Sequence, residues 1–240
     1  MLFKTKGIVL RSFKYSETSL IVEVYTREKG LKKYIVSGVR SKKAKVSANL
    51  LQLMTILDLV AYDKEGKELN RVKEIKAAHI YQDLPFDIRR SSVGLFITEV
   101  AQKVLKQSEQ HYELYDFLEL IYLYLDQKDA IVNNVHLYFL VHFTQYLGFQ
   151  PDGQYSKITP FFNLEEGTFV SDQMAKYSLD QRLSQILEQL LDSQLSTIDQ
   201  LSINRQERNQ LLEQLIRYYQ LHLENLPNIS AHSILKEVLA

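Results

Sequence analysis

The chain has 240 residues, of which 45% are hydrophobic and 24% are charged, and it contains no cysteine. This composition is that of a globular protein with a substantial core, and the lack of thiols excludes a disulfide framework and a thiolate zinc site. The formal net charge is zero, yet residues 1–80 carry 17 basic and 8 acidic side chains, whereas residues 81–240 carry 12 and 21. This asymmetry predicts a polyanionic partner for the first third of the chain; a merely solvated surface is the alternative.

The sequence offers no candidate for a membrane-spanning segment. Its most apolar stretch, 131–149, is interrupted by asparagine, histidine, threonine and glutamine, whereas a span needs about 20 predominantly apolar residues. The N-terminus alternates polar and apolar residues, unlike a secretory signal. We therefore expect a cytoplasmic protein with no membrane partner.

The first 80 residues contain segments rich in β-branched and aromatic residues, separated by polar turns. Strands are expected at 6–13, 18–26, 31–37, 50–62 and 69–80. A basic run at 40–45 interrupts the series before the fourth strand. Five short strands within about 80 residues are typical of a small closed barrel, so we predict an N-terminal five-stranded OB-like β-barrel.

From residue 84 onward the apolar residues recur with a helical period. Helices are expected at about 85–107, 111–125, 131–147, 179–193, 204–224 and 230–239. Gly148 is expected to end the third helix, and Asn204 with Glu207 forms a capping box at the start of the fifth. A hairpin around Glu165 to Gly167 is expected at 157–170. The predicted fold class is α+β, with a barrel at 1–80 and a helical bundle at 81–240 that carries a short β-hairpin insert at about 154–172.

Four motifs follow one another in the first 45 residues. They are Lys6-Gly7-Ile8-Val9-Leu10, Tyr15-Ser16-Glu17-x-Ser19-Leu20-Ile21-Val22, Thr26-x-x-x-Gly30-Leu31 and Gly38-x-Arg40-Ser41-Lys42-Lys43. Looser matches follow in Asp87-Ile88-Arg89, Leu147-Gly148-Phe149 and Tyr218-Tyr219-x-x-His222. In these motifs and their order, the chain resembles the bacterial RecO family of DNA-repair proteins.

The resemblance implies a non-catalytic mediator of DNA repair and recombination. Such a protein would bind single- and double-stranded DNA and anneal strands coated by single-stranded DNA-binding protein. It would also act with RecR to load RecA, in the bacterial cytoplasm at the nucleoid. The sequence carries no nucleophile elbow, zinc-protease or Walker A pattern, so we expect no enzyme. An RNA-binding barrel and a non-catalytic protein-interaction adaptor are the alternatives.

Cations and interleaved tyrosines in the first 45 residues are the candidate DNA-binding residues, because single-strand binders combine a positive groove with aromatic rings. The set is Lys6, Arg11, Lys14, Tyr15, Lys29, Lys32, Lys33, Arg40, Lys42, Lys43 and Lys45. The last four are expected to contribute most, because they are clustered without an acidic neighbour in sequence. In the alternative interpretation, Tyr25 and Tyr34 are core residues and the lysines solvate an edge strand.

The helical part offers a candidate partner site and a departure from the family pattern. The resemblance implies binding of the acidic C-terminal tail of single-stranded DNA-binding protein, for which Phe139, Phe143 and Tyr146 would supply an apolar pocket; plain core packing is the alternative. Many family members carry a cysteine zinc cluster after the Leu-Gly-aromatic element, but the insert here has no cysteine. We expect no metal and no cofactor. Either packing of Phe161, Phe162 and Phe169 replaces the metal, or the module is reduced.

Overall fold

The computed structural model describes residues 2–39, 46–62, 67–105 and 110–239. The chain divides into two compact units. The first consists of Met1–Asp87 and Thr98–Lys128, and the second of Ile88–Ile97 and Asp129–Ala240. None of the helices within the described residues is long and apolar enough to cross a membrane.

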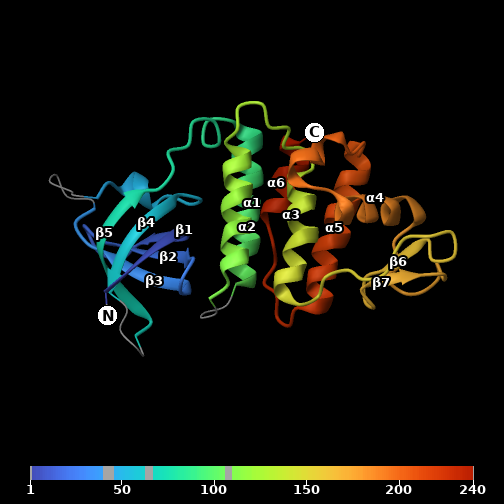
Figure 1. Ribbon diagram of the computed structural model, residues 1–240, viewed down its shortest axis with the longest axis horizontal. Helices are drawn as coiled ribbons and strands as arrows, with labels where there is room; N and C mark the ends of the chain where they lie inside the picture. Colours follow the sequence, from blue (N-terminus) through green and yellow to red (C-terminus); the bar gives the residue numbers. More distant parts are fainter. Residues whose placement is uncertain (1, 40–45, 63–66, 106–109, 240) are drawn as a thin grey trace. The chain divides into compact units, whose positions relative to one another are not determined.

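The first unit contains a closed five-stranded barrel (Figure 1). Its strands are β1 (Leu2–Lys14), β2 (Leu20–Thr26), β3 (Gly30–Val36), β4 (Ile56–Tyr62) and β5 (Leu69–Ala77). They are hydrogen-bonded in the order β1-β2-β3-β5-β4, with β3 and β5 parallel and the other pairs antiparallel. The predicted OB-like barrel is confirmed.

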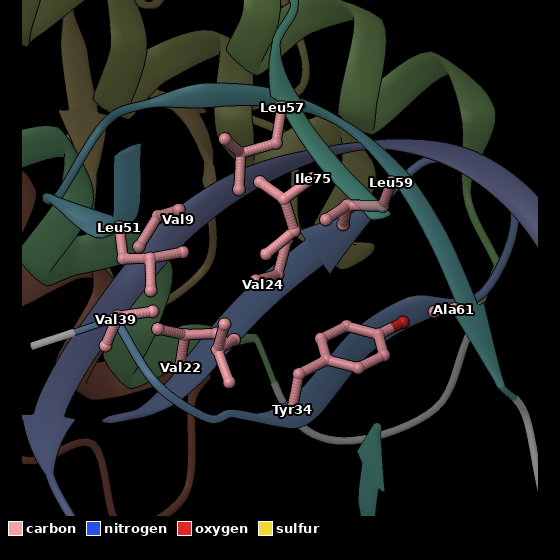
Figure 2. Packing of buried hydrophobic residues seen from close by; sticks show 11 residues of the cluster. Val9, Val22, Val24, Tyr34, Val39, Leu51, Leu57, Leu59, Ala61 and Ile75 are labelled. Carbon is pink, nitrogen blue, oxygen red and sulfur yellow. The ribbon is translucent and has the colours of Figure 1, made fainter. Parts of the chain in front are cut away.

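Alternate residues of the strands point into the barrel and fill it, together with Val39 and Leu51 from outside the strands (Figure 2). The filling includes Val9, Val22, Val24, Tyr34, Leu57, Leu59 and Ile75, all nearly inaccessible to solvent. Gly7 faces the same interior, and a Cβ placed there would lie 2.4 Å from Val24 Cγ1. The glycine of the first sequence motif therefore allows β1 to pass close to the side chains of β2 and β4.

One predicted strand is wrong in its first half. The apolar run at 50–62 begins with a 3-10 helix, Ala48–Leu51, and strand β4 starts at Ile56. Between them Met54 adopts a positive φ of 70°, which breaks an extended chain. Leu51 is 1% exposed and packs with the barrel cluster, so its apolar character reflects closure of the barrel core. A short apolar run in the sequence fits both a buried strand and a buried helical turn, so it could not show where the strand begins.

Helix α2 (Tyr112–Leu125) covers part of the outer surface of the barrel. Ile8 and Tyr25 point outward from β1 and β2, yet they are 0% and 2% exposed. On the same strands and in the following turn, Lys6 Nζ lies 2.9 Å from Glu119 Oε1, and Arg27 Nε lies 2.7 Å from Asp116 Oδ1. Both carboxylates belong to α2. The hydrogen bond from Arg27 holds the pKa of Asp116 below its usual value.

A single carboxylate organises the segment that leaves the barrel. Asp126, at the end of α2, accepts hydrogen bonds from the backbone N–H groups of Gln82, Asp83 and Leu84 at 2.9 Å and contacts His79 Nε2 at 2.8 Å. Burial raises the pKa of this carboxyl, but the hydrogen bonds outweigh burial and lower it. Residues 79–84 are thus fixed to α2 within the first unit.

The predicted helices are present with shifted ends (Figure 1). Besides α2 they are α1 (Ile88–Val104), α3 (Val135–Phe143), α4 (Gln181–Asp192), α5 (Arg205–His222) and α6 (Ala231–Val238). The third starts four residues later than predicted, and the residue just before it, Asn134, donates from its side-chain amide to the carbonyls of Ile198 and Leu201. It continues as a 3-10 helix, Thr144–Leu147, and ends at Gly148, with φ 82°.

The predicted hairpin insert is present in the second unit as β6 (Phe161–Asn163) and β7 (Thr168–Val170). Asn163 Oδ1 accepts from the backbone N–H groups of Glu165 and Glu166 at 2.9 and 3.0 Å. Gly167 completes the turn with φ 70°. The sequence therefore located both the hairpin and the glycine that its turn requires.

Candidate nucleic-acid interface

A row of side chains runs across the outside of the barrel, perpendicular to the strands. Cα pairing places Phe13 beside Ile21, Ile21 beside Ile35, Ile35 beside Arg71, and Arg71 beside Tyr62. Adjacent members are one strand spacing, ~4.8 Å, apart. Phe13 is 40% exposed and Tyr62 is 43% exposed. We call these five residues the outer row. They combine aromatic, aliphatic and cationic side chains and follow the outside of the closed barrel from β1 through β2, β3 and β5 to β4.

A second row lies beside the outer row and carries more charge. Arg11 on β1 pairs in register with Glu23 on β2, which pairs with Lys33 on β3. Lys33 Nζ lies 3.8 Å from Glu23 Oε1. The Arg11 guanidinium lies 5.3 Å from the centre of the Phe13 ring, which connects the two rows. Two of the predicted DNA-binding cations are therefore together on one face, with a carboxylate between them.

The end of β1 places two more predicted residues next to this face. Lys14 is the last residue of β1 and is exposed, and Tyr15 follows it with 59% of its surface exposed. The loop is tight, because the backbone N–H groups of Tyr15 and Ser16 both donate to the carbonyl of Ser19. In OB-folds this loop and the β2–β3 face are the usual contacts for oligonucleotides.

The cations at the other end of β1 have a different environment. Lys6 pairs with Glu119, as described above. It also lines a cavity of 410 Å³ in which Lys4, Lys6 and Lys76 face Glu28, Asp58 and Glu74. We call this cavity the mixed-charge groove. Three carboxylates offset three ammonium groups there, so the predicted basic set does not form one continuous positive face.

Two other predicted cations and the two remaining interleaved tyrosines do not join the outer row. Lys29 lies in the β2–β3 turn, at the end of β2 far from Tyr15. Lys32 pairs in register with inward-facing Val24, so it does not share the face of Lys33. Tyr25 and Tyr34 are 2% and 1% exposed and are core residues, so base stacking on them is excluded and the alternative interpretation is correct for both rings. Arg40, Lys42, Lys43 and Lys45 lie outside the described residues.

A second cavity, of 570 Å³, is lined by described residues at the end of β4 and around the start of β5. Its lining comprises Tyr62, Lys67, Leu69, Asn70 and Arg71. We call it the β4–β5 groove. Two of its residues, Tyr62 and Arg71, belong to the outer row. The part of its lining that the structure describes contains no carboxylate, whereas residues 63–66, between Tyr62 and Lys67, lie outside the described residues.

The sequence prediction missed several residues of this surface, namely Phe13, Ile21, Ile35, Tyr62 and Arg71. Alternation along β1 could have identified Phe13, because it lies two positions after Arg11 and therefore points to the same face. Tyr62 and Arg71 had no such signal. They join this surface through the parallel pairing of β3 with β5, which nearness in sequence does not reveal.

In the second unit, two of the three predicted partner-binding residues are inaccessible. Phe139 and Phe143 are both 0% exposed, and their rings stack 4.8 Å apart. Tyr146 is half-buried. Phe139 and Phe143 thus offer a peptide no surface at these positions, which agrees with core packing.

The hairpin insert is packed by rings and does not fit a zinc ion. Phe162 and Phe169 are 0% and 6% exposed, with ring centres 5.1 Å apart, and Phe161 is half-buried. His222 contacts the Leu164 carbonyl through Nε2 at 2.9 Å and lies parallel to the Phe149 ring. Within the described ranges, no group of three potential ligands could hold a metal ion. The rings of Phe162 and Phe169 thus form the packed centre of the insert.

The architecture defines the class: a two-part protein that joins an OB-like barrel to a helical region. Models of one known protein family match both parts of the chain. Residues 1–81 match the family model described as recombination protein O N terminal, and residues 85–230 match recombination protein O C terminal. The chain belongs to the RecO family.

Relatives named DNA repair protein RecO are similar to the chain from end to end. The one from Flavobacterium psychrophilum is 35% identical over 241 residues, which cover 100% of both chains. The one from Christiangramia forsetii is 33% identical over 239 residues, or 99% of each chain. A third, from Phocaeicola vulgatus, is 32% identical over 241 residues and 100% of both. The resemblance found in the sequence motifs is thereby confirmed.

Proposed function

We propose that this protein is a non-catalytic mediator of DNA repair that binds DNA through the outer row of its barrel and the cations beside it. Arg11, Lys14 and Lys33 would contact backbone phosphates, and Phe13 and Tyr15 would contact bases or sugars. The observation that supports this most directly is the outer row on an OB-like barrel, in a chain of the RecO family. The bacterial relatives support action in the cytoplasm at the nucleoid.

The proposed mechanism is electrostatic and needs no bond chemistry. Two complementary strands repel each other through their phosphates. A protein that neutralises phosphates releases counterions, and it lowers this repulsion at the place where the bases meet. Contacts to phosphate carry no sequence information, so one surface can serve any pair of complementary strands and both single-stranded and duplex DNA. Annealing would then proceed by ordinary base pairing.

A pair of matched double variants tests the binding surface. Arg11→Ala with Lys33→Ala removes two cations next to the outer row, and Lys4→Ala with Lys76→Ala removes two from the mixed-charge groove. We expect the first pair to weaken DNA binding and to reduce the slope of log K against log salt by about 0.7 per lost single-strand phosphate contact. The second pair should change both much less. Equal effects of the two pairs would contradict the proposed surface.

The cluster at 40–45 is tested separately, because it lies outside the described residues. Arg40, Lys42, Lys43 and Lys45 changed together to Ala should weaken DNA binding sharply and flatten its salt dependence. Unchanged affinity and slope would remove these four residues from the interface, while the Arg11 and Lys33 result would stand on its own.

The mediator activity has its own assay. We expect the protein to accelerate annealing of complementary oligonucleotides, both bare and coated with single-stranded DNA-binding protein, and with RecR to promote loading of RecA on the coated strand. Absence of annealing in the presence of normal DNA binding would contradict the mediator proposal. Tighter binding of RNA than of DNA of the same sequence would favour an RNA-binding barrel, and salt-insensitive association with proteins alone would favour an adaptor.

The proposed protein partners follow from membership of the RecO family, and the burial of side chains limits which predicted residues can contact them. We propose that RecR and the C-terminal tail of single-stranded DNA-binding protein both bind this chain. Since Phe139 and Phe143 are fully buried, Tyr146 is the one position of the predicted three where a tail could touch the surface. Titration of the tail peptide against Tyr146→Ala should show weaker binding than against the wild type. Undiminished binding would place the tail elsewhere.

A further inference from the structure

We infer that Lys176 and Arg217, which meet at the ring of Tyr177 beside the hairpin insert, bind the phosphate backbone of DNA and give the second unit a DNA contact of its own. The inference rests on the proposed function, because it assigns to annealing a place where the second strand is held. We call Lys176 and Arg217 the cation pair. Neither belongs to the predicted DNA-binding set, and both lie within 110–239, which the structure describes without a gap.

The two cations converge on one aromatic ring. Lys176 Nζ lies 4.5 Å and Arg217 Cζ lies 4.3 Å from the centre of the Tyr177 ring. The ring attracts both positive charges. Hydrogen bonds to the phenol oxygen, from Lys176 and then from Arg217, also lower the pKa of Tyr177. Because both distances are measured to one centre, two exposed charges that repel each other are held close together.

The backbone that carries the cation pair is fixed. The Asn163 side-chain amide donates to the Lys176 carbonyl at 3.2 Å, and the N–H of Leu164 donates to the Tyr177 carbonyl at 3.1 Å. Tyr177 has a φ of 70°, which residues other than glycine rarely adopt unless the surrounding contacts impose it. Arg217 is held by helix α5. Less conformational freedom is therefore lost when a ligand orders the two cations.

The charges around the cation pair leave a local positive excess. Residues 129–240 contain 7 basic and 13 acidic residues, yet neither cation of the pair forms a salt bridge with a described residue. Glu213, four residues before Arg217 on α5, is paired with Lys236 instead. The hydrogen bond to Tyr177 raises the pKa of Lys176, and attraction to the exposed Glu165 adds to this effect. A phosphate chain can therefore approach this acidic unit at the cation pair.

The chemistry of the cation pair suits a phosphate better than a base or an acidic peptide. Lysine and arginine together offer several N–H donors to the oxygens of one phosphodiester. The Tyr177 ring is already engaged by the two cations, so it is not an open platform for a base. An acidic peptide needs apolar contacts as well as charge, and this ring does not offer them. Phosphate contacts exist in both single-stranded and duplex DNA.

A phosphate contact in the second unit supplies what annealing requires. The outer row and the cations beside it provide a surface for one strand. The cation pair belongs to the other compact unit, so the chain carries two separate groups of cations. One chain can then hold both strands whose bases are to pair, and neutralising phosphates on each strand lowers the repulsion between them.

The experiment compares the double variant Lys176→Ala with Arg217→Ala, in the full chain, with the control Lys157→Ala. Lys157 is an exposed cation of the same insert that lies outside the pair. We expect the double variant to weaken binding of single-stranded and duplex oligonucleotides alike, by about three- to tenfold at low salt. The slope of log K against log salt should fall by about 0.7 per lost single-strand contact and about 0.9 per lost duplex contact. The control should change these quantities much less, and thermal unfolding checks that each variant is folded.

Two further measurements sharpen the test. The double variant should slow annealing of complementary oligonucleotides by a larger factor than it weakens binding of either strand alone, because the barrel still holds one strand. Glu165→Gln removes the opposing carboxylate and should strengthen DNA binding at low salt but not at high salt. Unchanged affinity, salt slope and annealing rate in the double variant would overturn the inference, as would losses equal to those of Lys157→Ala.

The remaining outcomes separate this inference from its rivals and from the proposed function. If the double variant loses binding of a poly-glutamate peptide while DNA binding and annealing stay intact, the cation pair recognises acidic protein segments and the assignment to DNA is wrong. If the wild type binds no DNA, the proposed function fails together with the inference. A wild type that binds and anneals DNA normally, beside an unaffected double variant, rejects the cation pair alone.

Discussion

Glu23 lies between the two cations of the second row and has a side chain that is 12% exposed. Its carboxylate lowers the positive potential that Arg11 and Lys33 offer to phosphate. We expect Glu23→Gln to tighten DNA binding several-fold at low salt. The amide has nearly the shape of the carboxylate, but it does not repel the DNA phosphates. Titration at two salt concentrations measures this, and the gain should shrink at high salt. Weaker binding would mean that the carboxylate is needed to hold the two cations in place.

His136 is a second residue whose chemistry is set by its surroundings. It is 1% exposed, and burial lowers its pKa to about 3, with a further contribution from the positive charge of Arg208. In the unfolded chain the same group titrates near 6.5. Between these values the unfolded state binds more protons, so the stability provided by neutral His136 is present above about pH 6.5 and is lost as the pH falls toward 3.

This difference predicts acid sensitivity that depends on one side chain. Between pH 7 and pH 5 the wild type should lose about 2 kcal/mol of unfolding free energy through His136, since one pKa unit corresponds to about 1.4 kcal/mol. His136→Leu should lose correspondingly less over the same interval. Urea unfolding of both proteins at the two pH values gives the comparison. Parallel losses would show that other groups dominate the acid response.

At the scale of elements, the hairpin insert depends on contacts with neighbouring helices. Its strands have three residues each, too few to be stable alone. Phe162 is fully buried, its N–H donates to Ser184 Oγ at 2.9 Å, and its carbonyl accepts from the N–H of Leu179. The rings of Phe162 and Tyr218 lie 5.8 Å apart in an edge arrangement. The insert is held to α4 and α5 by these contacts.

The insert should therefore be insensitive to chelators and sensitive to loss of one ring. Phe162→Ala is expected to destabilise the second unit by about 3–5 kcal/mol, as for other large-to-small changes in a core. A strong chelator should leave the wild-type melting temperature unchanged. Thermal unfolding with and without chelator tests both statements. A tightly bound zinc ion in the purified protein, or a lower melting temperature on chelation, would contradict them.

At the scale of the whole molecule, the barrel and α2 belong to one compact unit, although about 35 residues separate the end of β5 at Ala77 from the start of α2 at Tyr112. Burial of Ile8 and Tyr25 and the four contacts to Asp126 depend on this arrangement. A boundary at residue 80 stays a prediction; the family models meet near the same place, at residues 81 and 85.

Truncation tests whether the first folding unit ends at residue 80, as the sequence predicts, or extends to residue 128, as the compact unit does. A chain that ends at residue 80 lacks α2 and Asp126, so its outer barrel surface would expose Ile8 and Tyr25 to water. We expect that fragment to lack a cooperative thermal transition, whereas a fragment that ends at residue 128 should show one. Circular dichroism of both fragments is the measurement. Cooperative unfolding of the shorter fragment at the temperature of the longer one would contradict the role of α2.

Much of the fold could be predicted from the sequence because its signals are local. Strand alternation, the capping box of Asn204 with Glu207, the terminating Gly148 and the turn at Gly167 all depend on residues a few positions apart. The predicted element boundaries were wrong where contacts with residues distant in sequence are involved. Leu51 was assigned to a strand because its role in closing the barrel is set by tertiary packing. The third helix was predicted to start before Asn134, whose side chain instead forms hydrogen bonds with the carbonyls of Ile198 and Leu201.

The sequence by itself determined the family, the order of barrel and helices, and the excess of cations in the first part of the chain. Tertiary structure alone decided which of those cations share a face. Pairing across the barrel brings Arg71 and Tyr62 into line with Ile35, while carboxylates from α2 pair with Lys6 and Arg27. The physical reason is that net charge adds along a chain regardless of position, whereas the field that a phosphate meets depends on the distances between charges in space.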